Sequence, residues 1–142
     1  MSIRTALLPK DTNQHGTIFG GVILSHLDIA GAIEAKRFCE QEVVTVALKE
    51  VVFEEPVFVG DLVSFYTRIV ATGRTSITVE VAVASFPETL KRSYCLVTKA
   101  VVVYVAVDEA RKPTPLKVRA SEIDPPAFAP EYLNSRLQAD ST

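Results

Sequence analysis

Cysteine is scarce in this chain, and the two that occur, Cys39 and Cys95, are far apart. Neither has the close spacing of a zinc knuckle or of a CxxC redox pair. We therefore expect no bound metal. With so few thiols and no pairing motif, a reducing cytoplasm is the simplest setting for the protein.

The sequence also lacks long apolar runs and clusters of positive charge. No window reaches the ~20 apolar residues that a helix needs to span a bilayer. The N-terminal MSIRTALLPK has no apolar segment of the kind found in signal peptides. Lys and Arg are scattered, and the formal net charge is −2. Because neutralising a row of phosphates takes a basic stripe, nucleic acid is not an expected partner. Without an apolar run of spanning length, membrane insertion is not expected either. The 142 residues suit one compact domain.

One segment, residues 22–38, contains no proline and a single glycine. It is apolar nearly all round until its last turn, which contains Glu34, Lys36 and Arg37. This pattern predicts a mostly buried helix whose last turn emerges into solvent. Cations in that turn also suit the negative end of the helix dipole.

The remaining elements read as strands. A short run at 3–8 precedes the helix, and four runs rich in β-branched residues follow it, at 43–53, 61–71, 75–86 and 93–107. Short turns between long strands favour antiparallel neighbours. The sequence therefore predicts an α+β fold in which a curved antiparallel sheet of five to six strands wraps around one long central helix.

The end of the chain has a different composition. Prolines interrupt any long element there, at positions 113, 115, 125, 126 and 130. We expect the folded domain to comprise residues 1–116 and a proline-rich extension to comprise 117–142, in which 131–139 could form a short terminal helix.

The predicted helix has a stripe of small or polar residues at helical spacing, made of Gly21, Ser25, Asp28, Ala32 and Ala35. The opposite face is expected to pack on the sheet, and it contains Val22, Ile23, Leu27, Ile29, Ala30 and Ile33. This geometry predicts a polar groove beside the carboxylate of the stripe.

Asp28 is the first candidate for chemistry. A carboxylate in the middle of an apolar helix loses hydration, which is the tuning that a general base needs. The structural alternative is a carboxylate satisfied by nearby backbone or by a cation. At the helix entrance, Gly20 and Gly21 leave unpaired N–H groups open to a developing oxyanion, although a glycine pair can equally make a tight turn. Asn13 and His15 in the preceding loop could orient a water or a carbonyl, or simply cap the loop.

The segment Asn13-x-x-Gly16-x-x-Phe19-Gly20-Gly21, followed by Asp28-x-Ala30-Gly31, resembles the hotdog-fold acyl-CoA thioesterases, in the branch related to brain-type acyl-CoA hydrolase. The similarity continues through residues 43–46, 53–61, 73–76 and 104–108. It covers residues 1–116 and leaves out the tail.

The resemblance implies hydrolysis of fatty acyl-CoA to free fatty acid and coenzyme A, a reaction of fatty acid metabolism in which coenzyme A is substrate and product and no cofactor is needed. It assigns Asp28 as general base or nucleophile, Asn13 as a group that holds the water or carbonyl, and the glycines at 20 and 21 as the oxyanion hole. It further implies a homodimer with shared active sites, joined edge to edge, and a homohexamer built as a trimer of dimers. Substrate contacts are implied at His15, Phe19, Gly73, Arg74, Thr75, Ser76, Thr98 and Lys99.

Two other functions fit the same fold. A hydratase or dehydratase acting on an enoyl or hydroxyacyl thioester would use a histidine, for which His15 is available. Asp28 is at the helix position where the resemblance places the thioesterase carboxylate, which favours hydrolysis over the hydratase. A non-catalytic acyl-CoA-binding protein fused to a DNA-binding module is disfavoured, because the sequence contains no basic recognition segment. A serine hydrolase is disfavoured too, since no GxSxG motif is present.

Overall fold

The computed structural model describes residues 17–18, 20–86 and 95–119, together with the backbone of residues 3–6. The predicted helix and the four predicted strands after it are all present, with bounds within two residues of those expected. The elements are β1 (Ile3–Ala6), α1 (Gly20–Phe38), β2 (Glu42–Phe53), β3 (Leu62–Thr72), β4 (Ser76–Phe86) and β5 (Cys95–Val107).

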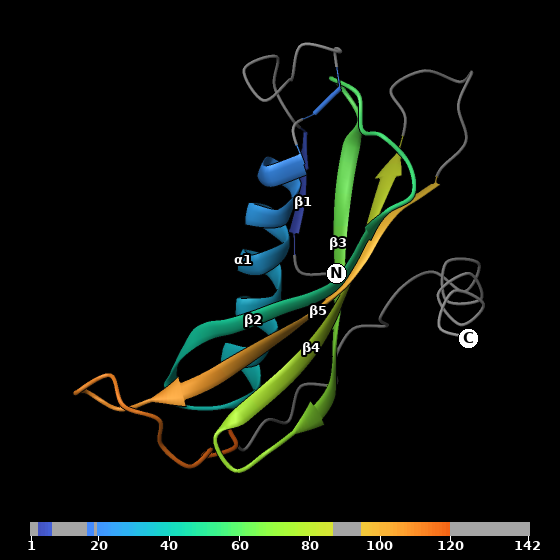
Figure 1. Ribbon diagram of the computed structural model, residues 1–142. Helices are drawn as coiled ribbons and strands as arrows, with labels where there is room; N and C mark the ends of the chain where they lie inside the picture. Colours follow the sequence, from blue (N-terminus) through green and yellow to red (C-terminus); the bar gives the residue numbers. More distant parts are fainter. Residues whose placement is uncertain (1–2, 7–16, 19, 87–94, 120–142) are drawn as a thin grey trace.

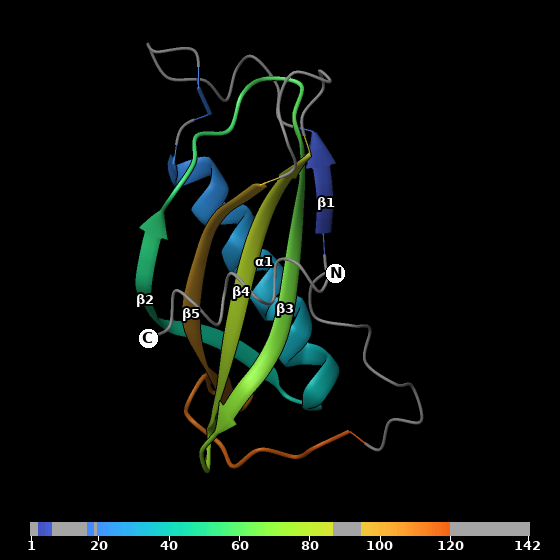
Figure 2. The same ribbon diagram turned by 90° about the vertical axis from the view of Figure 1, so that its right-hand side faces the viewer.

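The strands form one antiparallel sheet in the order β1-β3-β4-β5-β2. The sheet curves, and α1 lies across its concave side (Figures 1 and 2). This confirms the prediction of one helix wrapped by a sheet of five to six strands. Strand β2 is at the edge of the sheet and has β5 as its neighbour. Hydrogen-bonding register shifts interrupt the β2–β5 pairing between Thr45 and Ala47 and again between Lys49 and Val52.

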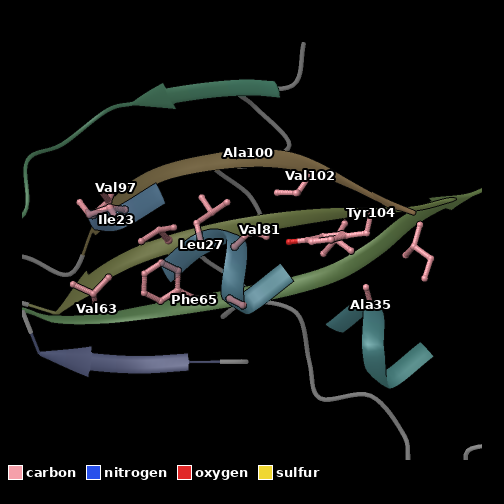
Figure 3. Close-up of a cluster of buried hydrophobic side chains, with 14 of the residues drawn as sticks. Ile23, Leu27, Ala35, Val63, Phe65, Val81, Val97, Ala100, Val102 and Tyr104 are labelled. Carbon is pink, nitrogen blue, oxygen red and sulfur yellow. The ribbon is translucent and has the colours of Figure 1, made fainter. Parts of the chain in front are cut away.

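The hydrophobic core lies between α1 and the strands β3, β4 and β5 (Figure 3). The helix buries Ile23, Leu27, Ala30, Gly31 and Ala35, which recur at the three- and four-residue spacing of a single face. These side chains meet strand residues that alternate along the sheet, including Val63, Phe65, Val81, Val102 and Tyr104.

The predicted division of the helix was correct for Ile23, Leu27 and Ala30 and wrong for two isoleucines. Ile29 and Ile33 are 51% and 38% exposed. Ala35, a member of the predicted stripe of small or polar residues, is instead fully buried. The reason is geometric: a helix that is apolar nearly all round meets a single sheet with one face only, so its remaining apolar residues stay uncovered within one chain.

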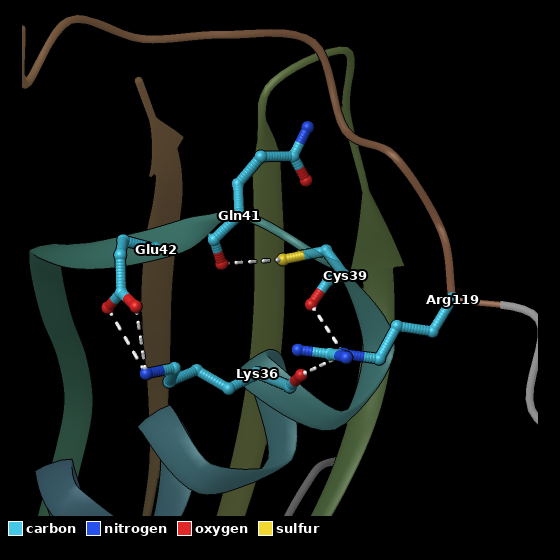
Figure 4. A network of polar contacts seen from close by, with 5 residues as sticks. All are labelled: Lys36, Cys39, Gln41, Glu42 and Arg119. Carbon is cyan, nitrogen blue, oxygen red and sulfur yellow. Dashed lines mark hydrogen bonds and ion pairs between the residues drawn. The ribbon is translucent and has the colours of Figure 1, made fainter. Parts of the chain in front are cut away.

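The C-terminal end of α1 is fastened by the segment that follows β5 (Figure 4). Arg119 donates from Nε to the carbonyls of Lys36, at 2.9 Å, and Cys39, at 3.0 Å. Lys36 also pairs with Glu42 at 3.1 Å. A guanidinium at this end satisfies carbonyls that the helix leaves unpaired. The predicted boundary between residues 116 and 117 stays a prediction, and most of the proline-rich tail, with residues 131–139, lies outside the described residues.

No helix in the described part of the chain is long and apolar enough to cross a membrane. Within the same residues, no group of three or more His, Cys, Asp or Glu side chains is arranged to hold a metal ion.

Candidate active site

A turn between β2 and β3, held by a buried carboxylate, places the start of α1. The carboxylate of Asp61 is fully buried, and its Oδ2 accepts hydrogen bonds from the amide of Phe58 and the hydroxyl of Ser85, each at 3.0 Å. Gly60 takes a φ of 90°, a left-handed conformation that favours glycine. The amide of Ile18 then donates to the carbonyl of Val57 at 2.8 Å. Since the helix begins two residues after Ile18, this turn fixes the position of the helix N-terminus.

The helix entrance borders a pocket. The ring of Phe53 covers Gly20, because a Cβ built on that glycine would lie 3.5 Å from Cζ of the phenylalanine. A pocket of about 330 Å³ opens beside this contact, lined by Gly20, Ile23, Phe53, Glu54, Glu55, Pro56 and Val57. The first amides of a helix have no partner within the helix, so the entrance offers N–H donors next to a largely apolar space.

Asp28 lies two helical turns further on and is half-buried. Its Oδ1 accepts a hydrogen bond of 2.7 Å from the hydroxyl of Thr45 on β2. The phenol of Tyr104 on β5 donates to the main-chain carbonyl of Asp28 at 2.7 Å and lies 3.3 Å from Oδ1. Thr45 and Tyr104 are directly opposite each other in the β2–β5 pairing. Hydroxyls from two adjacent strands therefore hold the carboxylate that the sequence singled out.

Burial raises the pKa of the Tyr104 phenol, and the nearby charge of Asp28 raises it further. The phenol therefore stays protonated across the physiological range and serves as a hydrogen-bond donor. Neither Thr45 nor Tyr104 was singled out from the sequence. Both lie in the segments that carry the family resemblance, 43–46 and 104–108. Their alignment across two strands cannot be predicted from the local sequence.

The structure separates some of the predicted site residues. Gly21 and Asp28 share one face of α1, as expected, but seven positions of helix place them roughly 11 Å apart. Ser76 pairs with Val105 and Thr98 pairs with Val83, which puts the predicted contacts at 73–76 and 98–99 near opposite ends of the sheet. Asn13, His15 and Phe19 lie outside the described residues.

The turn at 73–76 is held by one hydrogen bond within the turn and two to later segments of the chain. The amide of Gly73 donates to the carbonyl of Ser76 at 2.9 Å, which closes the turn. The carbonyls of Thr75 and Arg74 accept from Ala106, at 2.8 Å, and Leu116, at 2.9 Å. The residue Arg74 is exposed, so its guanidinium is open to an anion.

At the other predicted contact, Thr98 is fully buried and its hydroxyl donates to the carbonyl of Val52. Lys99 is half-buried beside it. The hydroxyl of Thr98 therefore ties β5 to the edge strand.

The chain is similar to proteins of known family and structure. Residues 15–90 match the thioesterase superfamily. The acyl-CoA thioester hydrolase YciA of Salmonella typhimurium is 44% identical over 122 residues, spanning 82% of this chain and 90% of its own. A hexameric hotdog-fold thioesterase of Campylobacter jejuni is 43% identical, with a TM-score of 0.77 over 82% of this chain and 89% of its own.

A hexameric broad-specificity acyl-coenzyme A thioesterase, solved as a mutant enzyme, is 34% identical, with a TM-score of 0.80. The match covers 99% of this chain and 96% of the thioesterase chain. The protein is therefore a hotdog-fold protein, and it belongs to the thioesterase superfamily. The resemblance to hotdog thioesterases is confirmed. The brain-type branch within them stays a prediction.

Proposed function

We propose that this protein hydrolyses fatty acyl-CoA to free fatty acid and coenzyme A, as a cytoplasmic enzyme of fatty acid metabolism that uses no cofactor. The observation that carries the proposal is the carboxylate of Asp28, held by the hydroxyls of Thr45 and Tyr104 on a half-buried helix face. Identity of 44% to an acyl-CoA thioester hydrolase supports the same substrate class.

Asp28 acts as general base or as nucleophile in this proposal. As a base, it takes a proton from water while the water oxygen attacks the thioester carbon. The tetrahedral intermediate then breaks its C–S bond, and the proton passes to the departing thiolate of coenzyme A. As a nucleophile, the carboxylate attacks the thioester carbon, breaks the C–S bond and displaces the thiolate of coenzyme A, which leaves an anhydride. Water then cleaves the anhydride to the free fatty acid and the Asp28 carboxylate, and the second proton of the water goes to the thiolate. Both hydroxyl contacts are to Oδ1, so we assign Oδ2 to the attacking water or carbon.

The separation between Gly21 and Asp28 argues for a shared site. The carbon under attack and the oxygen that becomes the oxyanion are about 1.2 Å apart, so the base and the oxyanion donors must converge within a few ångströms. One helix cannot do this across roughly 11 Å. We propose that the Gly20–Gly21 amides of one protomer, together with its Asn13, act on the same thioester as Asp28 of a second protomer.

Exposed apolar residues support that dimer. Val46 on the edge strand β2 is 56% exposed, and Ile29 and Ile33 on the helix are exposed as well. An open sheet edge beside uncovered apolar residues favours pairing with a second copy. We propose a homodimer joined along β2, and a homohexamer made of three such dimers, since both of the similar structures described above are hexameric.

Coenzyme A carries phosphates that need cationic partners. We propose that Arg74 binds one of them, with help from the turn residues Gly73, Thr75 and Ser76. The other proposed contacts are Thr98 and Lys99, with His15 and Phe19 from the loop before the helix. Because 73–76 and 98–99 lie near opposite ends of the sheet, a single coenzyme A that touches both sets must bridge two protomers.

The purified protein is expected to release free thiol from acyl-CoA, measured with a thiol-reactive dye over a range of acyl chain lengths. The same preparation should not hydrate 2-enoyl-CoA, followed by the loss of enoyl absorbance. Hydration without thiol release would replace hydrolysis with the hydratase alternative. Binding of acyl-CoA without any turnover would identify a non-catalytic binding protein.

A mixture of two inactive chains tests the shared site. Asn13→Ala and Asp28→Asn chains, co-expressed and purified together, should recover about one quarter of the wild-type activity. Half of the dimers are mixed, and each mixed dimer contains one intact site out of two. A single-chain site predicts no recovery.

The matched control co-expresses the wild-type chain with a chain that carries both substitutions. Mixed dimers then contain no intact site, so the shared arrangement predicts about one quarter of wild-type activity, from wild-type homodimers alone. A single-chain site predicts about one half, because every wild-type chain would work on its own.

A further inference from the structure

Tyr104 reaches through the core to the backbone of α1. It lies on β5, is fully buried, and points its ring toward the helix (Figure 3). Its phenol donates to the main-chain carbonyl of Asp28 at 2.7 Å. A core aromatic would fill this space equally well without a hydroxyl, so the polar contact to the helix backbone calls for a separate explanation.

A glycine makes this contact possible. A Cβ built on Gly31 would lie 2.2 Å from the phenol oxygen of Tyr104 and 3.0 Å from Cζ. Any other residue at this position would displace the ring or the helix. Gly31 lies in the middle of α1, where glycine is a poor helix former. It follows Asp28 by three residues and therefore lies one turn further along the helix.

We infer that Tyr104, packed against Gly31, is a positioning residue. It sets the position of α1 along its axis and the rotation of α1, so that the Asp28 carboxylate meets Thr45. The contact to a main-chain carbonyl limits sliding of the helix along its axis. The ring in the gap at Gly31 limits rotation of the helix. Thr45 is opposite Tyr104 in the sheet, so the two hydroxyls hold the carboxylate at one point of the β2–β5 pair.

The catalytic part of this inference rests on the proposed hydrolysis, and Tyr104→Phe tests it. The variant keeps the ring and loses the donor. The kcat for acyl-CoA hydrolysis should fall about three- to tenfold, as for the loss of one ordinary hydrogen bond. The KM should not change, because the fully buried Tyr104 does not contact substrate.

Tyr66→Phe is the matched control. Tyr66 is also buried, but it lies between Phe65 and Thr67, whose side chains face the helix, so it faces the other side of the sheet. The Tyr66→Phe variant should lower the unfolding midpoint without changing kcat. A structural role alone for Tyr104 would give the two variants the same result.

Crystal structures of the wild type and of Tyr104→Phe test the positioning without turnover. In the variant, the distance from Thr45 Oγ1 to Asp28 Oδ1 should exceed hydrogen-bonding range or α1 should shift along its axis. The inference requires both this displacement and the fall in kcat, and an unchanged result in either overturns it. If the wild type hydrolyses no acyl-CoA, the proposed function fails, and the crystal structures alone decide whether Tyr104 positions Asp28.

Discussion

Asp28→Asn should lower the kcat for thiol release from acyl-CoA by at least about a hundredfold, the usual contribution of a general base. Asparagine has the same shape as aspartate, and its side-chain oxygen can still accept the hydrogen bond from Thr45. It can neither take a proton from water nor attack a thioester. The substitution therefore removes the chemistry and leaves the contacts of the carboxylate in place.

Glu34→Gln is the matched control for this variant. Glu34 is also a half-buried carboxylate on α1, and it accepts a hydrogen bond from the hydroxyl of Thr67 at 3.1 Å. Its activity should stay at the wild-type level. Circular dichroism and light scattering should show that both variants keep their fold and assembly. Full activity in Asp28→Asn would remove Asp28 from the mechanism.

Asp61→Ala should lower the free energy of unfolding by about 3 kcal/mol, because it leaves two donors without their acceptor, and one of them is fully buried. Those donors are the amide of Phe58 and the hydroxyl of Ser85. The turn that they stabilise holds the residues before α1, so the helix entrance should loosen as well. Urea denaturation at a fixed protein concentration measures the loss, since the stability of an oligomer depends on concentration.

Asp61→Asn separates the hydrogen bonds from the charge. Both donors are bonded to a single oxygen, Oδ2, and the side-chain oxygen of asparagine can take its place. We expect a loss well below that of Asp61→Ala. An equal loss in the two variants would mean that these two bonds alone do not hold the turn.

The elements of this fold could be predicted from sequence because periodicity and composition determine them locally. The apolar run at 22–38 has the length and continuity of a helix, and β-branched runs mark β2 to β5 almost to the residue. The faces of the helix were harder to predict. Ile29 and Ile33 are as apolar as Ile23, and nothing local distinguishes the face that meets the sheet of the same chain from a face left open.

The candidate site was predictable in part for a related reason. Asp28 was identified because a carboxylate is conspicuous in an apolar helix. Its partners Thr45 and Tyr104 are ordinary strand residues, and they meet only through the register of two strands that are distant in sequence. The register shift between Thr45 and Ala47 falls next to that pair. Counting residues along β2 therefore gives no reliable alignment with β5.

The close fit between Gly31 and Tyr104 has a consequence for how the sequence can diverge. A larger residue at 31 is tolerated only once the side chain at 104 has become smaller, because the Cβ would otherwise meet the phenol oxygen at 2.2 Å. A smaller residue at 104 leaves a cavity in the core until position 31 has grown. Neither change is accepted easily before the other. Among relatives of this protein, the two positions should therefore covary, and chains that lack the glycine should also lack the tyrosine.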